Sequence, residues 1–147
     1  MTTIVYNAKT AEIACDSRTT TDKIIVTDNA QKWFDYHGWR VFCTGQTCDI
    51  YNLQHNFSNN QFDTIESLEF IKYHPKKGVW YGCVKRGTYK SEPLAQSYAI
   101  GSGQQAAMFG LLNGYNTVEI VEQVKRVDFR TGGDIHCFKV TDPLEST

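Results

Sequence analysis

The sequence predicts a single α+β domain, spanning residues 1–147, in which helices pack over a sandwich of two β-sheets. Three observations support this prediction. β-rich segments open, divide and close the chain, and helix-like segments separate them. The composition of 41% hydrophobic and 21% charged residues over 147 residues is typical of one soluble core, without a disordered tract. The expected order is strands, two helices, strands, two helices and a final strand.

The N-terminal third is predicted to be almost entirely strand. Residues 2–6 and 11–15 are rich in β-formers and read as a hairpin. Residues 23–27 and 39–44 are two further strands, and Gly38 provides the turn before the second of them.

The middle of the chain is predicted to hold two helices. After Gly45, three apolar residues occur at helical spacing: Ile50, Leu53 and Phe57. Asn59-Asn60 is expected to end that helix. A second, short helix is expected over residues 64–73, and Pro75 and Gly78 are expected to stop it.

The C-terminal half is predicted to return to strands before two more helices. Residues 79–84 and 88–91 form the next expected hairpin, which turns at Arg86-Gly87. The remaining expected elements are a strand over 98–100, a helix over 104–112, a helix with Thr117 as its N-cap, and a last strand over 134–141.

Several functional classes are disfavoured by composition. The net charge of −1 provides no general attraction for nucleic acid, and no apolar run approaches the roughly 18 residues that span a membrane. No secretory signal is evident at the N-terminus, so we expect a cytoplasmic protein. The chain has five cysteines: Cys15, Cys43, Cys48, Cys83 and Cys137. Their odd number and the lack of a CxxC pair indicate reduced thiols. The lack of zinc-finger spacing argues against a metal site.

The first two residues suggest a nucleophile. Cytosolic aminopeptidases remove methionine before a small residue, so we expect Met1 to be lost and Thr2 to gain a free amine. One residue then holds both a hydroxyl nucleophile and a base, because an α-amine has an ordinary pKa of about 7.7–8.0. On its own, a Met-Thr start is a very weak signal, because many proteins begin this way and an ordinary strand start is then the better interpretation.

Five short sequence blocks make the Met-Thr start a more informative signal. They occur in order as TTIV (2–5), ACDSRTT with NAQK (14–20 and 29–32), TGQTCD (44–49), AIGSG (99–103) and DFRTGG (128–133). Together they resemble the proteasome β-subunits and HslV, which are N-terminal nucleophile (Ntn) hydrolases. The blocks cover most of the chain outside residues 56–97. The resemblance implies a four-layer αββα fold and a threonine peptidase that needs no cofactor.

The resemblance also implies roles for individual residues. Thr2 would be the nucleophile and, through its amine, the base, while Lys32 would lie beside it and pair with Asp16. Gly45 would donate its backbone N–H to the oxyanion. Two further groups would orient the Thr2 amine, Ser102 and Asp128, with Thr131 completing the set.

For substrate binding, the resemblance implies that Thr20 and Gln46 flank the substrate strand. Cys43 would lie at the floor of a medium-sized apolar specificity pocket. Simple core packing is an equal alternative for Cys43, and a helix N-cap is an equal alternative for Ser102.

Partners follow from the same resemblance. It implies unfolded polypeptide as substrate, a homo-oligomeric ring, and an ATP-dependent unfoldase as a candidate partner. The chain is shorter than most family members between Asp49 and Ala99, where the family contacts the opposite ring and the ATPase, as a compact bacterial or phage-type relative would be. Two alternatives remain open: a catalytically silent assembly or interaction protein, and an amidase for a small molecule.

Overall fold

The computed structural model describes residues 2–140, and within them eleven strands form antiparallel sheets of four, five and two strands. The strands are β1 (Thr3–Asn7), β2 (Glu12–Cys15), β3 (Thr19–Thr21), β4 (Ile24–Thr27), β5 (Trp33–Tyr36), β6 (Trp39–Gly45), β7 (Ser67–His74), β8 (Gly78–Lys85), β9 (Thr88–Pro93), β10 (Tyr98–Gly101) and β11 (His136–Lys139). The helices are α1 (Thr47–Asn56), a 3₁₀ turn (Phe57–Asn59), α2 (Gln104–Leu112) and α3 (Thr117–Lys125).

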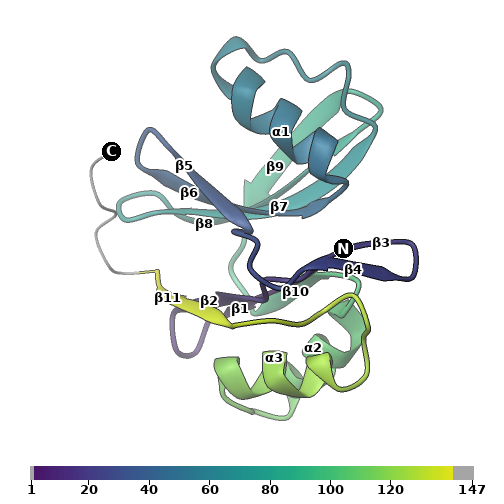
Figure 1. Ribbon diagram of the computed structural model, residues 1–147. Coiled ribbons are helices and arrows are strands. Elements are labelled where there is room, and N and C mark those ends of the chain that lie inside the picture. The colour runs from purple at the N-terminus through teal and green to yellow at the C-terminus, as the bar shows by residue number, and fades with distance from the viewer. Residues whose placement is uncertain (1, 141–147) are drawn as a thin grey trace.

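The two larger sheets have different connectivity. The four-stranded sheet has the order β10-β1-β2-β11, so the N-terminal strand β1 lies inside it. The five-stranded sheet runs β5-β6-β7-β8-β9 in chain order. The β3–β4 hairpin forms the two-stranded sheet and projects beside the sandwich (Figure 1).

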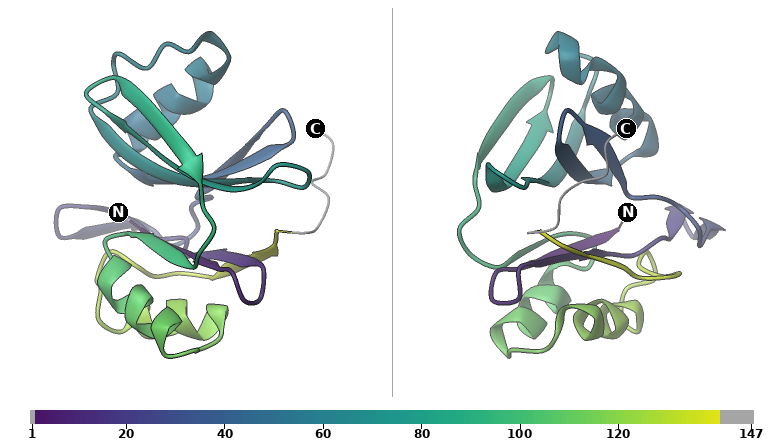
Figure 2. Two further views of the ribbon diagram at one scale, coloured as in Figure 1. Left: turned by 180° about the vertical axis from the view of Figure 1, so that it is seen from behind. Right: turned by 90° about the vertical axis from the view of Figure 1, so that its left-hand side faces the viewer.

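Three apolar clusters hold these elements together. One lies between the large sheets, where Ile4 and Ile100 meet Phe42 and Ile71. A second packs α1, through Leu53, on the outer face of the five-stranded sheet. The third packs α2 and α3 on the outer face of the four-stranded sheet. Helices therefore cover the outer face of each large sheet (Figures 1 and 2). None of the helices within residues 2–140 is long and apolar enough to cross a membrane.

Most of the predicted elements are confirmed. β1 and β2 form the N-terminal hairpin, β8 and β9 form the later one, and the helix over 104–112 has the predicted bounds. The chain leaves the 3₁₀ turn through Asn60, whose φ of 53° lies in the left-handed region, so the end of α1 is also as expected. The final strand is shorter than predicted, and its expected last residue, Thr141, lies outside the described residues.

The second predicted helix is wrong. Residues 67–74 form β7 in the middle of the five-stranded sheet. Both faces of this sheet are covered: Leu68 and Phe70 join the cluster under α1, and Ile71 and Tyr73 join the cluster between the sheets. A strand buried on both faces loses the alternation that identifies strands, so its apolar run was misread as a helix.

Two strands and one helix cap also differ from the prediction. The short strands β3 and β5 were not expected. Asn116, not Thr117, caps α3, because its side chain accepts a hydrogen bond from the Glu119 backbone N–H at 3.0 Å. The Thr117 hydroxyl instead donates to Glu12 at 2.8 Å and is buried.

Candidate active site

Thr2 lies at the start of β1 and is almost fully buried, with 1% of its surface exposed. Its carbonyl accepts a hydrogen bond from the Ser102 backbone N–H at 2.8 Å. Gly101 makes this approach possible, because its φ is +102° and a Cβ there would lie 1.7 Å from the Thr2 carbonyl oxygen. The predicted removal of Met1 concerns a residue outside the described range and stays a prediction.

The Thr2 hydroxyl donates a hydrogen bond to Oδ1 of Asp16. Asp16 directly follows β2, which pairs with β1, and its carboxylate is fully buried. Backbone N–H groups satisfy the rest of this carboxylate: Thr3 donates to Oδ1 at 3.3 Å and Gly132 donates to Oδ2 at 2.9 Å. These contacts fix Asp16 and, through it, the orientation of the Thr2 hydroxyl.

Lys32 lies beside this group, but its contact differs from the prediction. Its Nζ donates to the carbonyl oxygen of Arg18 at 2.5 Å, and the ion pairs found within residues 2–140 do not join it to Asp16. Burial lowers the pKa of Lys32, and the negative charge of Asp16 opposes that effect. Asp16 therefore acts on Lys32 through its charge, without direct contact.

A second network surrounds the Asp128 carboxylate. The Ser102 and Thr131 hydroxyls each donate to Oδ2 at 2.6 Å, and Thr131 Oγ1 lies 2.6 Å from Thr3 Oγ1. Burial raises the pKa of Asp128, but these hydrogen bonds outweigh it and hold the pKa below its ordinary value. The three predicted residues thus form one cluster, here called the Asp128 cluster, that contacts the first residues of β1.

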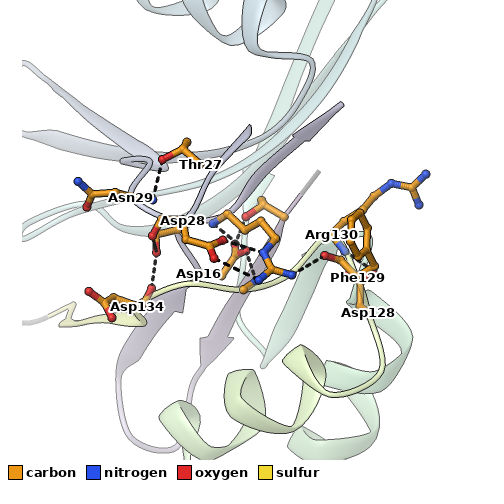
Figure 3. A network of polar contacts seen from close by, with 12 residues as sticks. Asp16, Thr27, Asp28, Asn29, Asp128, Phe129, Arg130 and Asp134 are labelled. Carbon is orange, nitrogen blue, oxygen red and sulfur yellow. Dashed lines mark hydrogen bonds and ion pairs between the residues drawn. The ribbon is translucent and has the colours of Figure 1, made fainter. Parts of the chain in front are cut away.

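Arg18 joins the loop that carries Asp128 to the rest of the site. Its guanidinium binds both carboxylate oxygens of Asp28, at 2.7 and 3.2 Å, and donates to the Phe129 carbonyl at 3.0 Å. Figure 3 shows Asp28 and Phe129 on either side of this network, with Asp16 between them. Gly132 packs against the guanidinium, since a Cβ there would lie 2.3 Å from its Cζ.

Thr2 opens onto a cleft of about 930 Å³ that runs along the end of the five-stranded sheet. Five other predicted residues line it as well: Thr20, Lys32, Cys43, Gly45 and Gln46. Cys43 satisfies both of its proposed readings, because it lines the cleft and also packs in the core under α1. Burial raises the pKa of its thiol, so it is a poor nucleophile.

Three contributors to the site were missed by the sequence analysis. Arg18 and Gly132 lie within the quoted blocks, but nothing in their spacing indicates that they pack together. Glu69 also lines the cleft; it was missed because its strand had been read as a helix. Among residues 2–140, no three histidine, cysteine or acidic side chains gather as metal ligands.

Comparison with known proteins identifies the fold. No protein-family model matches the sequence, and no curated protein matches it either. Among solved structures, the chain is similar to HslV from Trypanosoma brucei, with a TM-score of 0.68, 15% sequence identity and coverage of 93% of this chain and 99% of that one. It is also similar to Thiobacillus denitrificans BPH in complex with epoxomicin, with a TM-score of 0.71, 16% identity and coverage of 95% and 100%. The chain therefore has the α+β fold of the HslV-like N-terminal nucleophile hydrolases.

Proposed function

We propose that this protein is a threonine-type endopeptidase whose nucleophile is Thr2 after removal of Met1. The observation that carries the proposal is the hydrogen bond from the Thr2 hydroxyl to the buried Asp16, at a cleft that Lys32 and Gly45 also line. A hydroxyl, a buried carboxylate, a partly desolvated lysine and a glycine N–H are the groups that acyl transfer requires. The fold shared with HslV, in its full four-layer αββα form, supports the same reaction.

Acylation uses the two ends of the same residue. The Thr2 amine accepts the hydroxyl proton, and Oγ1 attacks the carbonyl carbon of a peptide bond, giving a tetrahedral oxyanion. The Gly45 N–H stabilises this oxyanion. When the intermediate collapses, the C–N bond breaks, the departing nitrogen takes the proton from the Thr2 ammonium, and an ester remains on Oγ1. Water then hydrolyses the ester by the same proton route.

The charged neighbours adjust this chemistry. The Lys32 ammonium disfavours a second positive charge nearby, so it keeps the Thr2 amine neutral and ready to accept a proton. Asp16 balances that charge and positions the hydroxyl. Ser102 and Asp128 orient the amine from the other side, and Thr131 supports them through its hydrogen bonds to Asp128 and Thr3.

The cleft of about 930 Å³ has room for a stretch of extended polypeptide as substrate, lying between Thr20 and Gln46 with one side chain over Cys43. We expect cleavage inside a homo-oligomeric ring in the cytoplasm, with an ATP-dependent unfoldase as a candidate partner. Enclosure in a ring would keep folded proteins away from Thr2, which has little selectivity of its own.

The test measures hydrolysis of an unfolded protein and the size of the enzyme in the same sample by light scattering. We expect hydrolysis of reduced, unfolded casein by an assembly several times larger than the 16.7 kDa chain. Thr2→Ala should abolish it, whereas Thr88→Ala, an exposed threonine on β9, should not. Absence of hydrolysis by a chain that has lost Met1 would contradict the proposal.

A further inference from the structure

A polar patch lies on the wall of the cleft, on the opposite side of β6 from Lys32. It consists of Thr44 on β6, Glu69 on β7 and Tyr81 on β8, and is here called the acceptor patch. Thr44 and Glu69 are directly paired across the two strands, so their side chains leave the same face of the sheet. Both of them line the cleft that holds Thr2.

The Thr44 hydroxyl is buried without a partner. Its residue is 3% exposed, and Oγ1 makes no hydrogen bond to any other described residue. Side chains alternate along β6: Cys43 packs under α1 and Phe42 packs between the sheets. Thr44 therefore shares the face of Phe42 and points toward β1, where Thr2 begins. An unpaired buried hydroxyl is destabilising, which makes this group a candidate to bind a ligand.

Glu69 adds a carboxylate of which one oxygen has a hydrogen-bond partner among the described residues. The Tyr81 hydroxyl donates to Oε2 at 2.7 Å, while no group within residues 2–140 hydrogen-bonds to Oε1. Lys85, an exposed cation on β8, donates to Ser67 Oγ at 3.3 Å. The ion pairs of the described residues leave Glu69 unpaired. The patch therefore presents one carboxylate oxygen and one hydroxyl, both able to accept.

The position of the patch decides which part of a substrate would meet it. In the five-stranded sheet β6 lies between β5 and β7, and its last residue is Gly45. Lys32 and the strand that follows it lie on the β5 side, whereas Glu69 lies on the β7 side. Thr20 and Cys43 line one part of the cleft, and Glu69 on β7 lines another. A peptide with its scissile carbonyl at Gly45 and its acyl part over Cys43 can therefore extend its leaving part toward β7.

We propose that the acceptor patch binds the cationic side chain of a lysine or arginine immediately after the scissile bond. An ammonium can donate to Glu69 Oε1 and Thr44 Oγ1 together, which satisfies the buried hydroxyl and pairs the carboxylate. The patch would then select the residue of the leaving group, independently of the pocket around Cys43. This inference rests on the proposed peptidase function, because it uses the substrate direction set by Thr2.

The test measures binding separately from cleavage. Two fluorescent peptides differ only in the residue after the scissile bond, lysine or norleucine, and are titrated into the full chain carrying Thr2→Ala. We expect the lysine peptide to bind about tenfold more tightly, equivalent to about 1.4 kcal/mol. Glu69→Gln should remove that preference. Glu119→Gln, at an exposed glutamate on α3 outside the cleft, should retain it. Equal affinities, or no binding of either peptide, would overturn the proposal.

The buried hydroxyl has its own test, which does not depend on cleavage. Thr44→Val keeps the shape of the side chain and removes the unpaired oxygen, so the thermal midpoint of the free protein should rise while the lysine preference falls severalfold. Thr47→Val, at an exposed threonine of the same cleft, should change neither. A lower midpoint for Thr44→Val would show that the hydroxyl already has a partner and would contradict the patch. Failure of the unmodified chain to cleave either peptide would overturn the peptidase proposal instead.

Discussion

At the scale of single residues, the site depends on how charge is arranged around Thr2. Asp16 is fully buried, yet backbone N–H groups and the Thr2 hydroxyl satisfy its carboxylate. Lys32 is held by a carbonyl oxygen instead of a carboxylate. Its ammonium is therefore not neutralised by direct contact, and its field reaches the Thr2 amine more strongly than that of a paired lysine.

Replacing Lys32 tests this arrangement. Lys32→Ala should slow acylation of Thr2 by at least about 100-fold, because the amine then has no cation to keep it neutral and the oxyanion loses a nearby positive charge. The rate is measured by mass spectrometry with a peptide epoxyketone at fixed pH. Lys90→Ala, an exposed lysine on β9, is the control and should acylate at the rate of the unmodified protein.

Asp128 predicts a dependence of stability on pH. Its pKa is lowered in the folded protein, so its stabilising contribution is present above the unfolded pKa of about 3.9 and is lost as the pH falls through the folded value. The difference in free energy of unfolding between the unmodified protein and Asp128→Asn should therefore shrink below about pH 4. Ser102→Ala removes one of the hydrogen bonds that lower the pKa of Asp128, so the pH-dependent loss should be smaller and should be complete at a higher pH. An unchanged difference between pH 7 and pH 3 would contradict this.

Much of the residue-level site was predictable from the sequence, because its members lie in short blocks at the ends of strands. The structure places Thr2 against Asp16, and Ser102 and Thr131 against Asp128. The direct pairing of Asp16 with Lys32 was not borne out, because the Lys32 ammonium donates to the Arg18 carbonyl oxygen, two residues further along the chain. Sequence spacing does not indicate which of these oxygens the lysine meets.

At the scale of elements, the wrongly predicted helix over residues 64–73 has an identifiable cause. The strand β7 carries apolar residues on both faces because helix α1 covers one face and the second sheet covers the other. The sequence pattern of such a strand does not differ from that of a short buried helix. Glu69 lies on this strand, so the acceptor patch was invisible until the strand was placed beside β6.

The turn before α2 makes a specific prediction about glycine. Gly101→Ala combines a left-handed φ with a clash against the Thr2 carbonyl, whereas Gly114→Ala has a φ of +75° and open space around it. The strain alone costs about 1–2 kcal/mol at either site. Urea unfolding should show a clearly larger loss for Gly101→Ala, and acylation of Thr2 should fall only in that variant. Equal losses would show that Gly101 serves the turn and not the approach of Thr2.

The loop after α3 should depend on Arg18 for its order. Arg18→Ala removes its contacts to Asp28 and to the Phe129 carbonyl, which join this loop to the segment after β4. We expect hydrogen exchange of the backbone N–H groups over residues 129–133 to become at least about tenfold faster. Arg126→Ala, an exposed arginine at the end of α3, should leave their exchange unchanged.

At the scale of the whole molecule, the fold was predictable because the order of strands and helices is informative and because five sequence blocks resemble one family. The functional groups come from opposite sheets: Thr2 and Asp16 from the four-stranded sheet, and Gly45, Thr44 and Glu69 from the five-stranded one. The cleft is lined by residues of the β3–β4 hairpin and by the ends of β6 and β7, next to Thr2. The sandwich therefore brings the proposed nucleophile, beside one sheet, to the proposed oxyanion donor on the other.

The most direct test of the central claim is the intact mass of the chain, expressed in a cytosol, before and after treatment with a peptide epoxyketone. The account predicts loss of Met1, followed by one covalent adduct that maps to Thr2 and is absent from Thr2→Ala. A chain that retains Met1, or that loses Met1 and forms no adduct, would contradict the proposal that Thr2 is a working nucleophile.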